Sequence, residues 1–338
     1  MPNITMQKVA ELAGVSMKTV SRVVNKEDGV KQETRRKVLA VIEQLEYQPN
    51  PSARGLASAR SYLIALLYDN PSTSYINGLQ NGVLTACRER DYGLLIHPCK
   101  HDDVNLCQNI KLMARQSRVD GLVLTPPLCD LEEVLDMLDG RGLKYVRISP
   151  LEHNDRSPVV YADELKAAYR MTQYLVSQGH VRIGFIAGQA NRSGTEMRLQ
   201  GHTQALEDNA IEVDPSLIIP GEYTFESGEA AARKLLRLGD RPTAIFACND
   251  YMAAGVMKVA NQMKIRVPYE LSISGYDDSP LAHHIWPRLT TIAHPVEQVA
   301  KQAASLLIKH LNGEPAVFYP DSIHSELVLR ESTGPLLD

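Results

Sequence analysis

From residue 62 onward, short apolar runs alternate with longer stretches of helical periodicity. This alternation predicts parallel, doubly wound sheets, and this part of the chain is long enough for two such lobes. The expected strands are 63–68, 93–97, 121–125, 145–148, 159–161, 183–187, 244–247 and 272–276. The expected helices are 75–90, 104–115, 131–138, 165–178, 198–209, 228–236, 253–263 and 296–311.

Polar residues follow most of these strands, where ligands bind in doubly wound sheets. Their mixture of Asp, Asn, Arg and Thr suits a hydroxyl-rich ligand, because each ligand hydroxyl both donates and accepts hydrogen bonds. Tyr75, Tyr223 and Trp286 are candidates to cover the apolar face of a sugar ring or base. Asp163 and Asp250 are equally suited to be helix N-caps, and Trp286 to pack within a lobe. The strand-end groups are Asp69, Asn70, Ser74, Tyr75, Thr125, Arg147, Ser149, Asp163, Asn249, Asp250, Asp277 and Asp278.

The first 46 residues have a different pattern, that of three short helices. Thr5 and Ser16 are suited to begin helices at 6–13 and 17–25, and Gly14 to end the first. Two short helices joined by Gly-Val-Ser form a helix-turn-helix, and a third amphipathic helix is expected at about 32–46.

The charge is distributed unevenly over the chain. The net charge of −4 divides into +4 over residues 1–60 (ten Lys/Arg, six Asp/Glu) and −8 over the rest. A small basic head favours a polyanionic partner. A structural or protein-binding three-helix domain is the alternative.

The second helix presents the residues that would read DNA. Met17, Lys18, Ser21 and Arg22 occupy the outward positions from which a recognition helix reaches base edges in the major groove. Hydroxyl and amide side chains, together with helix N-termini, are suited to phosphates. The predicted contacts in this head are Thr5, Ser16, Met17, Lys18, Thr19, Ser21, Arg22 and Asn25.

The segment after the third helix is predicted to form a very short helix. Asn50 is a suitable N-cap, Pro51 a suitable first residue, and about eight residues are too few to be helical alone. Asn50, Ala53 and Leu56 are predicted to meet DNA, with Leu56 as an apolar wedge in a minor groove. A linker whose leucine packs on a neighbouring domain is the alternative.

The motifs VAELAGVSMKTVSRVVN and YQPNPSARGLA, with the spacing between them, resemble the LacI/GalR family of bacterial transcriptional regulators. The resemblance implies that the hinge helices of two subunits pair in the minor groove and insert Leu56 at the centre of a palindromic operator. It also implies that Met17, Lys18 and Arg22 read bases. Lys31 departs from the family, which usually has a capping residue there.

The body resembles the family's effector domain, which is related to periplasmic sugar-binding proteins. The matching blocks include QGHVRIGFIAGQ, RPTAIFACNDYMAAGVMKVA and VPYELSISGYDDSPLA. Asp163 is implied to have a hinge role, and Glu164 stands where the family often has Asn. The implied effector contacts are Arg198 as the anchor, Asn249, Asp277 and Tyr223 from the second lobe, and Thr125, Arg147 and Tyr75 from the first.

Together these patterns predict three parts. They are a helix-turn-helix domain (1–48), a hinge helix (49–60) and an α/β periplasmic-binding-protein-like effector domain (61–338). Lobe 1 is expected at about 61–161 and 292–320, and lobe 2 at about 162–291 and 321–338. The chain is expected to cross between the lobes near 161–163, 290–293 and 318–323.

The predicted function is a dimeric repressor of carbohydrate-utilisation genes that binds palindromic double-stranded DNA and is released by a mono- or disaccharide. The closing residues ESTGPLLD contain no heptads, so a homodimer is expected. A purine or nucleoside effector, and ligand-enhanced DNA binding, are the alternatives.

Other classes of function have little support in the sequence. No nucleotide-binding, nucleophile-elbow or zinc-protease motif occurs, so an enzyme is not expected. Five cysteines without a CxxC pair predict neither a disulfide framework nor a metal site, and no cofactor is expected. The sequence shows neither a signal peptide nor an apolar run of about 18 residues, so we expect no membrane association and a cytoplasmic location.

Overall fold

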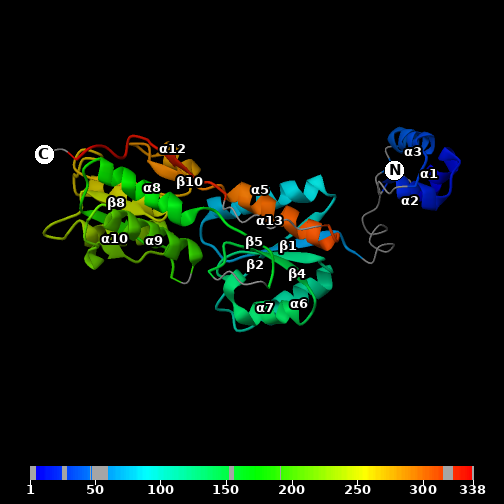
Figure 1. Cartoon of the computed structure of the whole chain (residues 1–338), viewed down its shortest axis with the longest axis horizontal. Coiled ribbons are helices and arrows are strands. Elements are labelled where there is room, and N and C mark those ends of the chain that lie inside the picture. Colours follow the sequence, from blue (N-terminus) through cyan, green and yellow to red (C-terminus); the bar gives the residue numbers. More distant parts are fainter. Residues whose placement is uncertain are drawn as a thin grey trace. The chain divides into compact units, whose positions relative to one another are not determined.

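The computed structural model describes residues 5–24, 29–45, 47, 60–151, 156–190, 192–314 and 323–336. The chain divides into two compact units, Met1–Tyr62 and Leu63–Asp338 (Figure 1). Four residues predicted to contact DNA, Asn25, Asn50, Ala53 and Leu56, lie outside the described residues.

The first unit contains α1 (Met6–Ala13), α2 (Met17–Val24) and α3 (Gln32–Gln44). The Thr5 hydroxyl accepts a hydrogen bond from the Lys8 backbone N–H, and Gly14 ends α1 in the left-handed conformation at φ +64°. Lys31 supplies no side-chain cap to α3. Val9, Val20, Val23, Val38 and Tyr47 are among the buried residues of its small core. The predicted helix-turn-helix is confirmed.

Lobe 1 of the second unit is built on a parallel sheet with strand order β2-β1-β3-β4-β5. Helices α5 and α13 lie side by side on one face of this sheet, and α6 and α7 cover the other (Figure 1). The strands are β1 (Leu63–Tyr68), β2 (Gly93–Pro98), β3 (Gly121–Leu124), β4 (Lys144–Ile148) and β5 (Val159–Val160). The helices are α5 (Thr73–Glu89), α6 (Leu106–Ser117), η1 (Leu128–Asp130), α7 (Glu132–Asp139) and α13 (Val296–Leu311).

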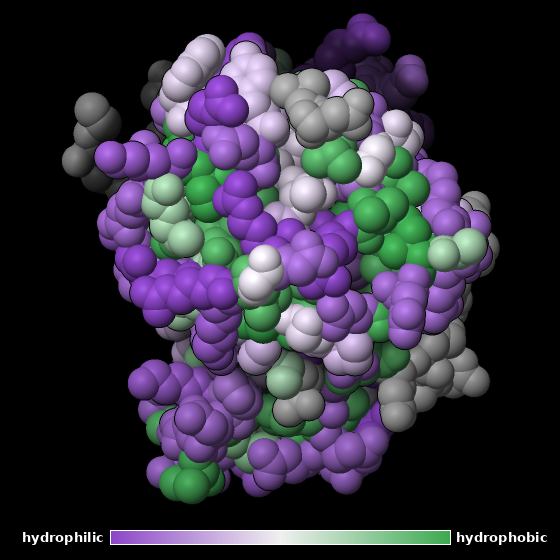
Figure 2. Space-filling view, turned by 90° about the vertical axis from the view of Figure 1, so that its left-hand side faces the viewer, coloured by the Kyte–Doolittle hydropathy of each residue, from purple (hydrophilic) through white to green (hydrophobic). Residues whose placement is uncertain are grey.

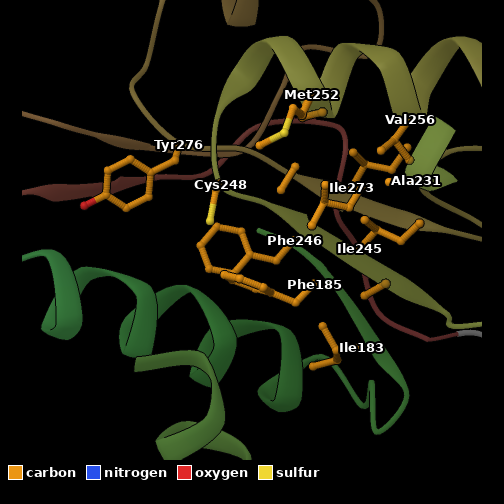
Figure 3. Packing of buried hydrophobic residues seen from close by; sticks show 14 of the residues in the cluster. Ile183, Phe185, Ala231, Ile245, Phe246, Cys248, Met252, Val256, Ile273 and Tyr276 are labelled. Carbon is orange, nitrogen blue, oxygen red and sulfur yellow. The ribbon is translucent and has the colours of Figure 1, made fainter. Parts of the chain in front are cut away.

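Lobe 2 repeats this plan with a parallel sheet of order β7-β6-β8-β9. Phe185 and Phe246 meet edge to face at its centre, while Tyr276 lies at the margin with its hydroxyl directed away from them (Figure 3). The strands are β6 (Ile183–Ile186), β7 (Ile218–Ile219), β8 (Ala244–Ala247) and β9 (Ser272–Ser274). The helices are α8 (Glu164–Ser177), α9 (Ser193–Asp208), η2 (Pro215–Leu217), α10 (Phe225–Leu235), α11 (Asp250–Gln262) and α12 (Pro280–His284).

The segments that join the lobes are tied to one another. The strands β10 (Thr291–Ala293) and β11 (Glu326–Val328) pair antiparallel, and Ala162 bridges to Ile323. Asp163 occupies the N-cap position of α8, but its side chain makes no capping bond. Its carboxylate instead accepts hydrogen bonds from the Ser325 backbone N–H at 2.7 Å and from Arg170. The Asp163 side chain therefore stabilises the crossover between the lobes rather than the start of α8.

The sequence pattern misses several short elements. The strands β7, β10 and β11 and helix α12 span two to five residues, which is too short for a period to be recognised. Helices α9 and α11 also begin several residues earlier than expected, at Ser193 and Asp250.

The end of lobe 2 away from lobe 1 carries hydrophobic patches separated by hydrophilic side chains (Figure 2). Among the described residues, no helix has the length and apolarity needed to cross a bilayer.

Candidate functional site

Helix α2 presents the polar face expected of a DNA-reading helix. Val20 and Val23 anchor its inner side, while Met17, Lys18 and Arg22 are exposed. The Ser16 hydroxyl accepts a hydrogen bond from the Thr19 N–H at 3.1 Å and lies 2.9 Å from the Thr19 hydroxyl, so both groups organise the start of the helix. Thr5 and Ser16 are exposed, whereas Thr19 and Ser21 are half-buried. The predicted base-reading residues that α2 leaves exposed are Met17, Lys18 and Arg22.

A polar cavity of about 50 Å³ lies between the two lobes of the second unit. It has room for little more than water, since ligand pockets usually measure about 300–1,000 Å³. It is lined by Asn70, Ser72, Tyr75, Pro126 and Ser149 from lobe 1, and by Glu164, Arg192, Ser193, Gly194, Arg198, Tyr223 and Asp277 from lobe 2. The lobes are therefore closed on each other around this cavity.

Two residues at the start of α9 make direct bonds across the cleft. Arg192 Nη1 donates to the carbonyl oxygens of Asp69 at 2.7 Å and Pro126 at 3.0 Å. The Ser193 hydroxyl donates to the carbonyl oxygen of Ser149. All three acceptors belong to loops that follow strands of lobe 1, so these bonds hold the lobes together.

Arg198 lies in the cavity wall as one half of a buried ion pair. Its Nε donates to Glu164 Oε2 at 2.7 Å, its Nη1 donates to the Cys248 carbonyl at 2.5 Å, and its guanidinium lies over the Tyr276 ring at 3.5 Å. His294 Nε2 is 3.1 Å from the other oxygen of Glu164. Burial alone would raise the pKa of Glu164, but Arg198 and His294 hold it well below its usual range. Glu164 is thus an ionised carboxylate inside the site.

Asp277 and Tyr223 complete the lobe 2 side of the cavity. Burial raises the pKa of Asp277 to about 6 against the opposing effect of Arg198. The Tyr223 hydroxyl lies 2.6 Å from that of Thr195, and its ring packs directly on Gly188. Ser149, Tyr223 and Asp277 all have positive φ (43°, 60° and 107°), so unfavourable backbone conformations gather at the cavity. Such strain commonly marks a functional site.

Four of the seven predicted effector residues line the cavity: Tyr75, Arg198, Tyr223 and Asp277. The structure does not bring the other three to it. Thr125 donates to the Leu67 carbonyl, and Arg147 Nε donates to Ser157. Asn249 caps α11, accepting from the Met252 N–H and donating to the Tyr223 carbonyl. These side chains stabilise neighbouring backbone and side-chain groups instead.

Two further candidates from the strand ends and aromatic residues also lie elsewhere. Asp250 accepts hydrogen bonds from the Ser279 N–H and the Thr291 hydroxyl. Trp286 is 81% exposed on lobe 2, so it neither covers the cavity nor packs within a lobe.

Sequence reasoning did not select Ser72, Arg192, Ser193, Gly194 or Glu164 for the site. Ser72 follows β1. Arg192, Ser193 and Gly194 lie at the start of α9, for which the sequence predicts a start at Arg198. An earlier helix start would have placed the α9 residues at a strand end. Glu164 stands where the family often has Asn, but only the fold shows which charges this residue meets.

The described residues offer no group of three or more His, Cys, Asp or Glu side chains placed to hold a metal. The five cysteines are all free, and Cys87, Cys129 and Cys248 are buried.

Two family models match the chain, one in each unit. Residues 5–50 match the model for bacterial regulatory proteins of the lacI family, and residues 172–333 match a periplasmic binding protein-like domain. The first match covers the helices of the first unit, and the second covers most of lobe 2 and part of lobe 1.

Curated relatives match over almost the whole chain. Catabolite control protein A of Priestia megaterium is 32% identical over 98% of this chain and 99% of its own length. The transcriptional repressor CytR of Escherichia coli K12 is 33% identical over 98% of this chain and 97% of its own length.

Solved structures match to the same extent. The lac repressor dimer bound to operator and an anti-inducer has a TM-score of 0.78 at 27% identity, covering 98% of this chain and 99% of its own. The regulator CelR in complex with cellobiose has a TM-score of 0.75 at 31% identity, covering 97% and 99%.

Proposed function

The chain belongs to the lacI family of bacterial regulatory proteins, and we propose that it is a dimeric repressor of carbohydrate-utilisation genes. Members of this family are DNA-binding transcription regulators and not enzymes. In our proposal the dimer binds a palindromic operator and leaves it when a mono- or disaccharide binds between the lobes. We infer a cytoplasmic location, because the operator is there.

The exposed face of α2 supports the operator-binding part of the proposal. Arg22 can donate two hydrogen bonds to a guanine edge, which is worth about 1–3 kcal/mol of discrimination between bases. Met17 and Lys18 lie on the same helix at its start, where a recognition helix meets the groove. We further propose that Leu56 enters the minor groove, with Asn50 and Ala53 beside it.

The polar character of the cavity supports a sugar effector. Arg198 Nη2 makes no hydrogen bond within the described part of the chain and can donate to a ligand hydroxyl. Asp277 can accept from another, and Tyr75 and Tyr223 supply ring faces. The similar structure of CelR contains cellobiose.

The surface of lobe 2 supports a homodimer. Tyr269 is 61% exposed and Trp286 81% exposed, beside a groove that also contains Leu281, Ile285 and Met257. Large aromatic residues on an apolar surface are typical of an interface. A two-fold dimer presents two α2 helices to the two halves of a palindrome.

The bonds across the cleft support the coupling between the two sites. A ligand that enters a 50 Å³ cavity must displace the lobes, and the bonds of Arg192 and Ser193 are the first to be altered. A coupling free energy of about 1–3 kcal/mol is sufficient to change operator occupancy strongly.

The observation that carries the proposal is a full-length relationship to repressors together with the exposed face of α2. The test is binding of the full-length protein to DNA from upstream of its own gene cluster, measured by fluorescence anisotropy over a series of salt concentrations. The titration is repeated with a panel of mono- and disaccharides, purines and nucleosides.

The proposal predicts tight, salt-dependent binding that one sugar releases. Release by a purine or nucleoside would replace the sugar with the alternative effector class, and binding that tightens with ligand would reverse the sign of control. Failure to bind any sequence within that cluster more tightly than unrelated DNA would refute the assignment as a local repressor.

A further inference from the structure

The two arginines that line the effector cavity are already engaged by other groups of the protein. Arg198 is paired with Glu164 at 2.7 Å. Arg192 donates to the carbonyl oxygens of Asp69 and Pro126 and, through Nε, to the side-chain oxygen of Gln189 at 2.7 Å. Both arginines are 5% exposed. An incoming anion would therefore compete with Glu164 for Arg198 and with three oxygen acceptors for Arg192.

The formal charges around the cavity sum to zero. Arg192 and Arg198 contribute two positive charges, and Glu164 and Asp277 contribute two negative charges. His294 faces Glu164 from the crossover segment but does not line the cavity, so it is not part of this sum. A buried ligand anion would meet two carboxylates, while Arg198 is already paired with Glu164 and Arg192 already donates to three oxygen acceptors, which is an unfavourable arrangement in a site screened from water.

An uncharged, hydroxylated ligand fits the same groups well. Arg198 keeps Nη2 as a donor, and Asp277 keeps its carboxylate as an acceptor because no hydrogen bond to that carboxylate exists among the described residues. Each of these groups can bond to a hydroxyl without any change in the net charge of the site.

We propose that Glu164 is a specificity-determining residue that restricts the effector to uncharged polyols. This role rests on the function proposed above, that of a regulator that responds to a sugar. In this role the Glu164 carboxylate pairs with the Arg198 guanidinium in the place that a ligand anion would otherwise take. Sugar phosphates, sugar acids and nucleotides are rejected because their charge has no partner in the closed site. The neutral sugar of the same skeleton is accepted.

The test uses inorganic phosphate as the probe and the full-length protein at pH 8, where an imidazole of ordinary pKa is uncharged. Calorimetry and thermal unfolding are measured against sodium chloride of equal ionic strength. The wild type is expected to show no saturable, phosphate-specific effect. Glu164→Gln frees the Arg198 guanidinium and is expected to bind phosphate at least about tenfold more tightly than the wild type.

Three variants control this result. Glu164→Asn, with the residue that the family often has there, is expected to behave like Glu164→Gln and guards against misfolding of the first variant. Arg198→Gln in the Glu164→Gln background is expected to abolish the gain. Glu229→Gln removes a carboxylate that pairs with Lys258 outside the cavity and is expected to leave phosphate binding unchanged.

Two outcomes of the phosphate measurements would overturn the proposal. One is phosphate binding by the wild type that Arg198→Gln abolishes. The other is the absence of any gain in both folded Glu164 variants. Neither measurement uses DNA, so they succeed or fail independently of the operator assay. In that assay, release of the wild type by a sugar phosphate but not by the parent sugar would keep the regulator and refute the role of Glu164.

Discussion

Replacing Arg192 by Ala tests whether bonds across the cleft keep the lobes closed. The change removes two hydrogen bonds from a charged donor to lobe 1 carbonyl oxygens, at 2.7 and 3.0 Å. Each such bond contributes about 1.5–3 kcal/mol, so the closed form should lose about 3–6 kcal/mol relative to the open form. This corresponds to a shift of about 10²–10⁴ in the ratio of open to closed molecules.

Hydrogen exchange followed by mass spectrometry measures that opening in the full chain without a ligand. The segments 69–75, 126–130 and 192–198 each contain residues that line the cleft. They should exchange faster in Arg192→Ala, while the strands of both sheets keep their protection. Arg192→Lys should recover only part of the protection, because a single ammonium group does not reproduce the geometry of the guanidinium.

Arg266→Ala is the matched control, since it removes an arginine whose ion pair with Glu270 lies on the surface of lobe 2. It should exchange like the wild type. The reasoning would be refuted if Arg192→Ala and Arg266→Ala gave the same exchange in all three cleft segments.

Three further predictions concern the operator, the cavity and the core. Leu56→Ala should weaken specific operator binding at least about tenfold and leave effector affinity intact; unchanged operator affinity would contradict the wedge. Gly188→Ala would place a Cβ 2.0 Å from Cζ of Tyr223, so the ring must leave its position and effector affinity should fall in a binding titration. In the control variant Gly239→Ala the new Cβ meets nothing within 4 Å, so effector affinity should stay unchanged. Burial lowers the pKa of His202 to about 3, below its unfolded value of 6.5, so stability from the neutral ring is lost as pH falls below about 6.5. Between pH 7.5 and pH 5 the free energy of unfolding should drop by about 2 kcal/mol more in the wild type than in His202→Asn, and equal drops in denaturant titrations would exclude this histidine as the cause.

Local patterns in the sequence predict most of the architecture. The eight expected strands match β1 to β6, β8 and β9 to within two residues at each end, because short apolar runs between polar turns form a recognisable signal. The first two helices are equally clear, since Thr5, Gly14 and Ser16 act through contacts within three to five residues.

The candidate site follows from the sequence only in part. The sequence identifies the polar residues at strand ends, but it does not show which of them remain available to a ligand. Thr125 and Asn249 have suitable chemistry and the expected positions, yet neighbouring backbone groups already occupy their hydrogen-bonding atoms. Buried polar groups must be hydrogen-bonded, and their partners are chosen by packing.

The sequence by itself determined the two units, the parallel sheets, the order of the elements and the polar character of the strand ends, because each depends on residues close together in the chain. Tertiary structure alone decided the charge of the cavity. Glu164 begins α8, Arg198 lies in the second turn of α9 and His294 lies two residues before α13, and no local pattern records that they meet. Their burial together makes the pairing strong, since desolvation leaves each charge dependent on its neighbour rather than on water.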